Sequence, residues 1–205
     1  MNSEAVVHVV DDDESLRTAL QRQLMAAGHR VSTYASAGEF LLTPPADAPG
    51  CLLLDLAMPG PSGLELQEAL GRHGIHLPVI FLTGHGDLAT GVRAMKSGAV
   101  DFLTKPVERN ALLDAIARAL EADAARRASR SAAADLRARF AQLTPRERKV
   151  FEHVVAGLLN KQIAGKLGVG ERTVKAQRAQ VMAKLGASNA AELGRMAADL
   201  QGQGD

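Results

Sequence analysis

The sequence contains little of what several common classes of protein depend on. It has one cysteine in 205 residues, so an internal disulfide is excluded and a disulfide-bonded scaffold is not expected. It has no run of about 18 apolar residues and no basic segment followed by an apolar stretch near its start, so neither a membrane span nor a signal peptide is indicated. We therefore expect a cytoplasmic protein with no membrane partner.

The single cysteine, Cys51, lies in the apolar segment CLLLDL at residues 51–56. A small buried hydrophobic residue is the expected role there, rather than a reactive thiol. The chain is long enough for one domain of ordinary size and a smaller one, each with its own core. Two domains are therefore expected.

Charge is distributed unevenly along the chain. Residues 1–120 carry 9 Lys and Arg against 14 Asp and Glu, whereas residues 121–205 carry 15 against 9. Within the basic part, residues 141–185 carry 9 positive and 3 negative side chains. This excess favours a polyanionic partner, and nucleic acid is the first candidate. The alternative is a solvated helix surface, because Lys and Arg are good helix formers.

In the first half, short apolar segments alternate with helical patterns. The apolar segments are residues 5–10, 30–34, 51–56, 78–83 and 99–104. The stretches between them carry leucines at helical spacing. Near-continuous apolar strands joined by crossover helices predict a five-stranded parallel sheet covered on both faces, which is a doubly wound α/β fold. The periodicity does not determine the order of the strands.

Polar residues stand where four of these predicted strands end. They are Asp11 and Asp12, Asp55, Thr83 and Lys105. Because ligands of such sheets bind beyond the carboxyl ends of the strands, we expect these side chains to meet at one edge. Crowded carboxylates repel one another unless a cation neutralises them, and Mg2+ prefers oxygen ligands. The pattern predicts a magnesium site beside which a carboxylate can accept a phosphoryl group, with a lysine and a threonine to contact its oxygens.

An alanine-rich segment separates the two halves. Residues 121–138, EADAARRASRSAAADLRA, contain 8 alanines and no Gly or Pro. High helix propensity with few large apolar groups predicts a helical linker over residues 122–139. A flexible tether is the alternative.

Four short helices are predicted after the linker. Thr144, Pro145 and Glu147 form a capping-box pattern with a proline in the first turn. Further helices are expected at about 160–167, 171–185 and 189–200. The turn KLGVGE between the second and third is short and contains glycine, as in a helix-turn-helix whose second helix enters the major groove. The second half is therefore expected to be a small all-α DNA-binding domain.

The four strand-end segments resemble a known family. The segments read VVDDDES, LLLDLAMPGPSG, IFLTGHGD and AVDFLTKP. They are similar to the signature segments of receiver domains of two-component response regulators, in the FixJ/NarL branch. The resemblance implies a flavodoxin-like receiver domain over residues 4–121. Carried over by position, it implies that Asp55 is the phosphate acceptor and that Mg2+ is held by Asp12 and Asp55 directly, by Asp11 through water and by the backbone carbonyl of Ala57.

The same resemblance implies switch residues. They are Thr83, Lys105 and the aromatic residue three positions before the lysine, Phe102. Taken alone, Phe102 is more readily interpreted as a core residue. Three positions depart from the pattern expected of the family: Pro61 after the acceptor, Ala57 where arginine is frequent, and His85. The side chains at positions 57 and 85 bear on the lifetime of the phosphorylated form.

The second half resembles the LuxR-type helix-turn-helix module over residues 140–202, through LTPRERKV, NKQIAGKLGV and RTVKAQRAQVMAKLG. The resemblance implies that Lys175 and Ala176 meet bases, with Ala179 one turn further on. Phosphate contacts are implied for Lys161, Gln162, Thr173 and Arg178. Two departures are Gln177, where histidine is common, and Gly170 at the cap of the recognition helix.

Together these features lead us to expect a response regulator and not an enzyme. A sensor histidine kinase would phosphorylate Asp55, and the protein would then form a homodimer, bind double-stranded promoter DNA and activate transcription with RNA polymerase. An aspartate phosphohydrolase is one alternative, although such enzymes usually carry Asp-x-Asp, whereas Leu56 and Ala57 follow Asp55. A helical domain that binds another protein or RNA is the second alternative.

Overall fold

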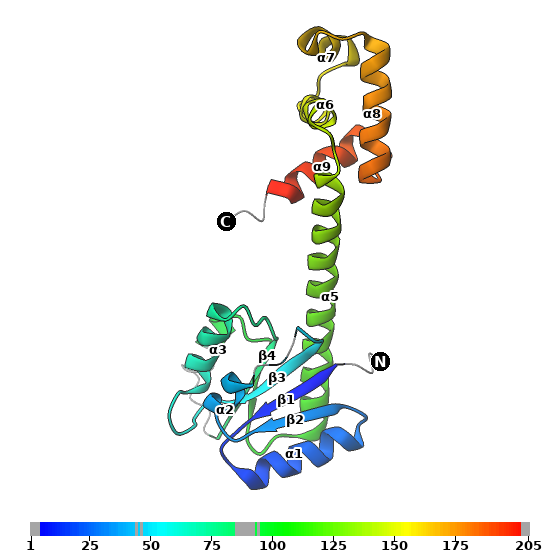
Figure 1. Ribbon diagram of the computed structural model, residues 1–205. Helices are drawn as coiled ribbons and strands as arrows, with labels where there is room; N and C mark the ends of the chain where they lie inside the picture. The colour runs from blue at the N-terminus through cyan, green and yellow to red at the C-terminus, as the bar shows by residue number, and fades with distance from the viewer. Residues whose placement is uncertain (1–4, 44, 46, 85–92, 94, 202–205) are drawn as a thin grey trace. The chain divides into compact units, whose positions relative to one another are not determined.

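The computed structural model describes residues 5–43, 45, 47–84, 93 and 95–201. The chain divides into two compact units, residues 1–126 and 127–205, which are drawn in Figure 1. Among the described residues, no helix is long and apolar enough to cross a membrane.

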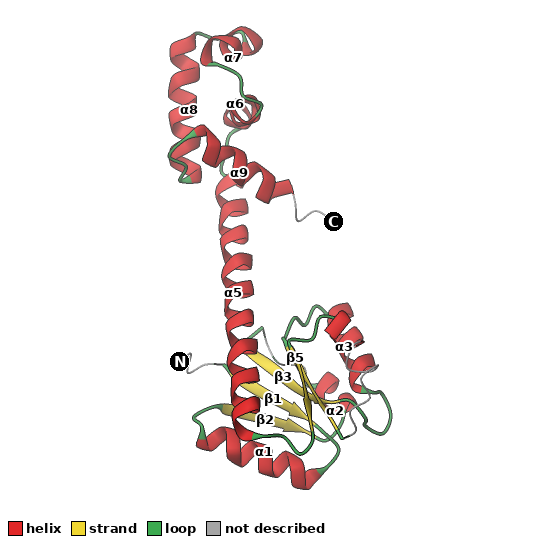
Figure 2. Ribbon diagram, turned by 180° about the vertical axis from the view of Figure 1, so that it is seen from behind, coloured by secondary structure: helices red, strands yellow, loops and turns green. Residues whose placement is uncertain are grey.

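The first unit contains a five-stranded parallel sheet. Its strands are β1 (Val6–Val10), β2 (Arg30–Tyr34), β3 (Gly50–Asp55), β4 (Val79–Thr83) and β5 (Asp101–Thr104). Their order is β2-β1-β3-β4-β5, and every neighbouring pair is parallel; β2, β1 and β3 can be followed side by side in Figure 2. The predicted fold class is confirmed, and the strand order adds what the sequence pattern left open.

Helices cover both faces of this sheet. Helix α1 (Glu14–Ala26) and the first part of α5 (Arg109–Ala141) pack on one face, where Leu24, Leu53 and Ile116 are fully buried. Helices α2 (Ala37–Leu42) and α3 (Gly63–Arg72) pack on the other, around Leu54 and Phe81. Alternate residues of the apolar strands therefore fill two separate cores, as expected for a sheet buried on both sides.

Helix α5 is continuous through the alanine-rich segment. Leu112 and Ile116 are buried against the sheet, and the buried carboxylate of Asp123 accepts a hydrogen bond from the Gly50 amide at 3.1 Å. Further along, Leu136 is buried in the core of the second unit. The segment predicted as a linker is thus helical over its whole length, while the domain boundaries at residues 121 and 140 stay predictions.

The second unit is entirely helical within the described residues. After α5 come α6 (Pro145–Val155), α7 (Asn160–Leu167), α8 (Glu171–Leu185) and α9 (Ala190–Gln201). The capping box predicted for α6 is present, because the Glu147 amide donates to Thr144 Oγ1 and the Thr144 amide donates to the Glu147 carboxylate. The core of the second unit includes five fully buried side chains: Val150, Ile163, Val174, Val181 and Leu193.

Two helices of the second unit begin without a side-chain cap. The N-cap residue of α7 is Leu159, whose side chain is 70% exposed, and the N-cap residue of α8 is Gly170. At α7 only half of a capping box forms, because the Gln162 side-chain oxygen accepts from the Leu159 amide at 2.8 Å. The first amides of both helices therefore lack the acceptor that Ser, Thr, Asp or Asn would provide.

A histidine is buried in the first unit. His8 on β1 is 5% exposed, its Nδ1 lies 3.3 Å from the Tyr34 hydroxyl, and its ring lies edge-on to Phe40. Burial lowers the pKa of His8 to about 4, because the charged imidazolium is disfavoured away from water. Folding therefore keeps this side chain neutral.

We expect His8 to make the first unit sensitive to acid. Its pKa is lower in the folded protein than in the unfolded chain, so stability is lost as the pH falls from about 6.5 to about 4, by about 3 kcal/mol in total. Urea unfolding followed by the fluorescence of Tyr34, the single tyrosine, measures this loss. In His8→Leu the decline should shrink by that amount, whereas replacement of the exposed His73 should leave it unchanged. Equal declines in the two variants would contradict the prediction.

A second prediction concerns the uncapped helices. Leu159→Ser should stabilise the start of α7 by about 1 kcal/mol, because serine caps well and leucine does not, whereas Gly170→Ser should change α8 by only a few tenths. Hydrogen–deuterium exchange of the amides in the first turn of each helix measures both effects. About fivefold slower exchange at α7, with little change at α8, is the expected outcome. Unchanged exchange at α7 in Leu159→Ser would show that capping does not limit this helix.

Candidate functional site

Three carboxylates gather at the carboxyl edge of the sheet. Asp55 is the last residue of β3, and Asp11 and Asp12 directly follow β1. Oxygens of all three side chains lie within 4.8 Å of one another. Asp11 and Asp55 are buried, whereas Asp12 is exposed at the rim. The predicted acidic cluster is therefore present as a geometric group.

A lysine ammonium lies against two of these carboxylates. Lys105, the first residue after β5, places Nζ 2.7 Å from Asp11 Oδ2 and 3.1 Å from Asp55 Oδ1. Its backbone amide donates to the carbonyl of Thr83 at 2.6 Å, which ties the end of β5 to the end of β4. The positive charge and the two buried negative charges thus partly neutralise one another.

Burial and charge act on the pKa of both partners. Burial raises the pKa of Asp55, and the negative charge of Asp11 raises it further, while the hydrogen bond from Lys105 opposes the change. For Lys105, burial lowers the pKa, but hydrogen bonds to Asp11 and Asp55 outweigh burial and the net direction is upward. The lysine is therefore held in its charged form beside the carboxylate.

Local structure fixes the orientation of Asp11 and leaves its neighbour Asp13 outside the cluster. The Asp13 carboxylate accepts from the amides of Ser15 and Leu16 at 2.8 and 3.1 Å, and so caps α1 as its place before the helix predicts. The Asp13 amide donates to Asp11 Oδ1 at 2.9 Å. Asp11 also accepts a hydrogen bond from Arg17 at its backbone carbonyl.

Helix α3 begins directly against Asp55. A Cβ built on Gly63 would lie 2.4 Å from the Asp55 carbonyl oxygen, a separation too short for any side chain. Ser62 and Glu65 form a capping box at this helix start. Neither Gly63 nor Arg17 is identified as part of the site by the sequence, although the pattern Ser62-x-x-Glu65 is a readable signal for the helix start.

The other predicted switch and ligand residues lie on β4, on β5 and just after β3. Thr83 is 4% exposed at the end of β4. Phe102 on β5 is half-buried, pairs with Phe81 and packs on the core. Ala57 is exposed, and its amide hydrogen-bonds the Asp55 carboxylate. His85 lies outside the described residues.

The donor set at this edge suits a hard divalent cation. Among the described residues it consists of carboxylate oxygens, and the group includes no nitrogen or sulfur ligand of the kind that zinc and copper favour. Octahedral ligands at about 2.1 Å from Mg2+ lie roughly 3 to 4.2 Å apart, and the carboxylate oxygens already lie within 4.8 Å of one another. Asp11, Asp12 and Asp55 therefore fit such an ion with small side-chain movements.

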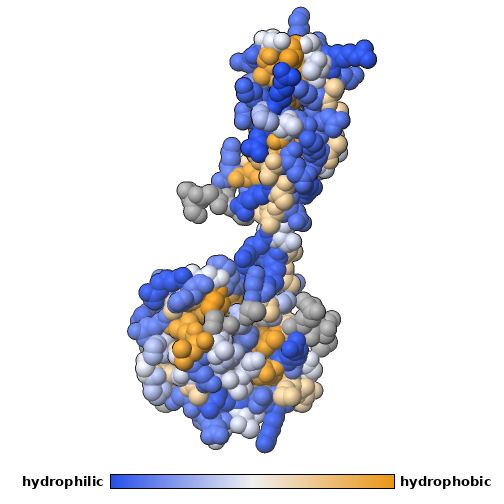
Figure 3. All heavy atoms as spheres, viewed as in Figure 1, coloured by the Kyte–Doolittle hydropathy of each residue, from blue (hydrophilic) through white to orange (hydrophobic). Residues whose placement is uncertain are grey.

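In the second unit, α8 has a buried side and an exposed side. Val174, Val181 and Leu185 are buried, whereas the opposite side is exposed at Thr173, Lys175, Ala176 and Ala179. Hydrophilic side chains cover most of the visible surface of this unit in Figure 3. The exposed side of α8 is therefore free of internal packing.

Two of the residues predicted to contact phosphates also have partners within the protein. Arg178 Nη1 donates to the Asn160 side chain at 3.1 Å, which links α8 to the start of α7. The Gln162 side-chain oxygen accepts from the Leu159 amide, so only its amide nitrogen can donate to a ligand. Lys161 is exposed in the first turn of α7.

Comparisons with known protein families agree with both parts of this arrangement. Residues 7–117 match the response regulator receiver domain. Residues 141–197 match the luxR family of bacterial regulatory proteins. The first match contains the acidic cluster and Lys105, and the second contains all of α6, α7 and α8.

Known relatives are similar over nearly the whole chain. The transcriptional regulatory protein FixJ of Rhizobium meliloti is 47% identical over 191 residues, which are 93% of this chain and 94% of the relative. Nodulation protein W of Bradyrhizobium diazoefficiens is 46% identical over 199 residues, which are 97% of this chain and 88% of the relative. The structure of the response regulator StyR is 45% identical, with a TM-score of 0.83, and the match covers 95% of this chain and 98% of that one.

These matches decide between the alternatives that the sequence left open. A receiver followed by a LuxR-type domain is the architecture of a transcriptional regulator and not of a phosphohydrolase. Receiver domains in general bind Mg2+ at an acidic pocket, and here that pocket is the cluster of Asp11, Asp12 and Asp55. The chain belongs to the FixJ-like two-component response regulators, in which a receiver domain is joined to a LuxR-type DNA-binding domain.

Proposed function

We propose that Mg2+-dependent phosphorylation of Asp55 by a sensor histidine kinase makes this protein dimerise, bind promoter DNA and activate transcription. The observation that carries the proposal is the meeting of Asp55 with Lys105 and the two other aspartates at one sheet edge. This arrangement combines a nucleophile, a fixed positive charge and oxygen ligands for a cation.

Phosphoryl transfer needs a carboxylate oxygen in line with the donor. An oxygen of Asp55 attacks the phosphorus of a phosphohistidine, the new P–O bond forms as the P–N bond breaks, and the imidazole leaves and takes up a proton. Lys105, at 3.1 Å from Asp55 Oδ1, is placed to hold an oxygen of the transferred group. Because the raised pKa of Lys105 keeps it charged, this stabilisation is available without a proton transfer.

The proposed ligands of Mg2+ are Asp12, Asp55, the backbone carbonyl of Ala57 and, through water, Asp11. The bound ion supplies charge neutralisation for the phosphoryl oxygens. Lys105 pairs with Asp11 and Asp55, so its ammonium and the cation share the same carboxylates. This sharing supports the proposal that the contacts of Lys105 with Asp11 and Asp55 change when Mg2+ and the phosphoryl group are bound.

The switch is proposed to run through Thr83 and Phe102. A phosphoryl group on Asp55 draws the Thr83 hydroxyl and the Lys105 ammonium inward, and Phe102 turns into the space that Thr83 leaves. Its half-buried position on β5 supports this role, since a fully packed ring could not turn. The changed surface beside β5 then allows a homodimer to form.

A homodimer presents two recognition helices to two half-sites. Linking the two modules raises the effective concentration of the second without new base contacts. We propose that Lys175, Ala176 and Ala179 face bases, and that Lys161, Gln162, Thr173 and Arg178 face phosphates. RNA polymerase is the proposed further partner in activation, as the resemblance to FixJ suggests.

The first test is the identity of the acceptor. After incubation with acetyl phosphate and Mg2+, intact-mass spectrometry should show a gain of one phosphoryl group in the native chain and none in Asp55→Asn. Asp13→Asn is the matched control, because asparagine caps α1 as well as aspartate does, and it should be labelled like the native chain. Labelling of Asp55→Asn, or labelling that persists with EDTA, would contradict the proposal.

The second test separates base from phosphate contacts in α8 and α7. On a duplex enriched by the phosphorylated protein from a random-sequence pool, Lys175→Ala should weaken binding by about 1–3 kcal/mol and relax the preference at one position. Lys161→Ala should weaken binding equally on all duplexes and reduce the salt slope by about one. Fluorescence anisotropy at several salt concentrations measures both. If Lys161→Ala changed the sequence preference and Lys175→Ala changed only the salt slope, Lys161 would be the residue that contacts a base and Lys175 the one that contacts a phosphate.

A further inference from the structure

The end of α5 and the end of the recognition helix α8 are joined in both directions. Arg139 on α5 donates from Nη1 to the carbonyl of Leu185, the last residue of α8, at 2.9 Å. Lys184 on α8 donates from Nζ to the carbonyl of Gln142, just after α5, at 3.3 Å. We call these two contacts the α5–α8 joint.

The carbonyl that Arg139 contacts has no donor within its own helix, because it belongs to the last turn of α8. The next residue, Gly186, adopts the left-handed conformation with φ +75, and a Cβ there would lie 3.0 Å from Arg139 Nη1. The glycine therefore ends the helix and leaves room for the guanidinium. A positive charge at this position also suits the negative end of the helix dipole.

Lys184 makes a second bond that anchors the joint to α6. Its Nζ lies 2.7 Å from Glu147 Oε2, the same oxygen that accepts the Thr144 amide in the capping box of α6. The hydrogen bonds from Lys184 and Thr144 lower the pKa of Glu147. One carboxylate therefore holds the end of α8 to the start of α6 over the ordinary pH range.

The end of α5 is held by α6 as well. Arg148 donates to the carbonyls of Leu143 and Ala141 at 3.2 and 3.3 Å, and its guanidinium lies over the ring of Phe140. Phe140 in turn packs edge-on against Phe151 at 5.2 Å. Backbone carbonyls, aromatic rings and charged groups thus converge where α5 stops.

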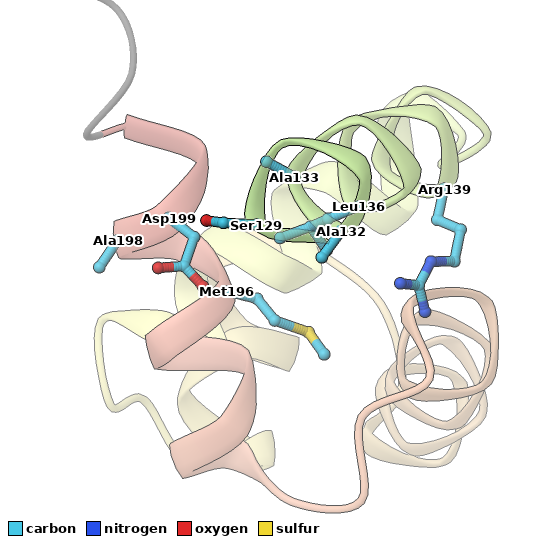
Figure 4. A pocket seen from close by; sticks show the side chains of 8 residues that line it. All are labelled: Ser129, Ala132, Ala133, Leu136, Arg139, Met196, Ala198 and Asp199. Carbon is cyan, nitrogen blue, oxygen red and sulfur yellow. The ribbon is translucent and has the colours of Figure 1, made fainter. Parts of the chain in front are cut away.

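Toward α9, the part of α5 from Ser129 to Arg139 is less closely packed. A groove of about 440 Å³ separates it from α9 and is lined by small residues of α5, such as Ala132, and by Met196 of α9. In Figure 4, Arg139 reaches from α5 toward α8, and its side chain also lines this groove. Arg139 therefore lies both at this groove and at the end of α8.

We infer that Arg139 and Lys184 are positioning residues that couple the recognition helix to α5. Helix α5 begins on the receiver sheet, where Ile116 is fully buried, so a change in the receiver that alters α5 is passed through the joint to α8. The inference deepens the proposed function and rests on it, because it assigns the residues through which phosphorylation changes DNA binding.

The test compares DNA binding before and after phosphorylation. The probe is a fluorescein-labelled duplex enriched from a random pool by the phosphorylated native protein, and Kd is measured with and without acetyl phosphate and Mg2+. In the double variant Arg139→Gln/Lys184→Met, the ratio of the two Kd values should fall at least fivefold toward one, while Kd without acetyl phosphate changes less than twofold. Arg146→Gln, at an exposed position on α6, removes one charge and should keep the native ratio.

The possible outcomes separate the inference from the proposed function. A native protein whose Kd does not respond to acetyl phosphate would overturn the proposed function and this inference with it. A native response that the double variant retains, or a double variant in which both Kd values weaken by the same factor, would overturn the inference alone. If circular dichroism shows that the double variant is unfolded, Arg139→Lys decides, since it keeps the charge but not the planar donor group. An intermediate ratio supports the inference, and a native ratio overturns it.

Discussion

The ammonium of Lys105 between the carboxylates of Asp11 and Asp55 is the interaction on which the site depends. Two buried negative charges at one sheet edge would repel each other strongly, and a single positive charge compensates both. The parallel sheet makes this possible, because β1, β3 and β5 all deliver their carboxyl ends to the same edge. Lys105 thus supplies these two carboxylates with a positive charge from within the protein.

Much of the fold and of this site could be predicted because each rests on local pattern. Apolar strands, strand-end aspartates and the capping box at Thr144 are visible in the sequence as residue types at fixed spacings. The strand order could not be predicted, because it depends on which crossovers pass which neighbours. Gly63 was missed because its role comes from the approach of α3 to the Asp55 carbonyl, a contact that no local pattern encodes.

The DNA-binding unit shows the same division. The buried face of α8 follows from its spacing, but the bond from Arg178 to Asn160 depends on how α7 and α8 cross. Charged residues that look equivalent in the sequence therefore differ in freedom: Lys175 projects from an exposed face, whereas Arg178 already holds two helices together. The number of positive charges alone indicates a polyanionic partner, but only the folded arrangement distinguishes their tasks.

The continuity of α5 has a consequence for how this architecture can change during evolution. Between Asp123 and Leu136 the helix is rich in alanine, so its length is set by helix propensity more than by packing. Each residue inserted or deleted there would rotate the last turns of the helix by about 100° and shift them by about 1.5 Å relative to its first turns. Length changes should therefore be tolerated in steps close to whole helical turns, such as seven or eleven residues, and selected against otherwise.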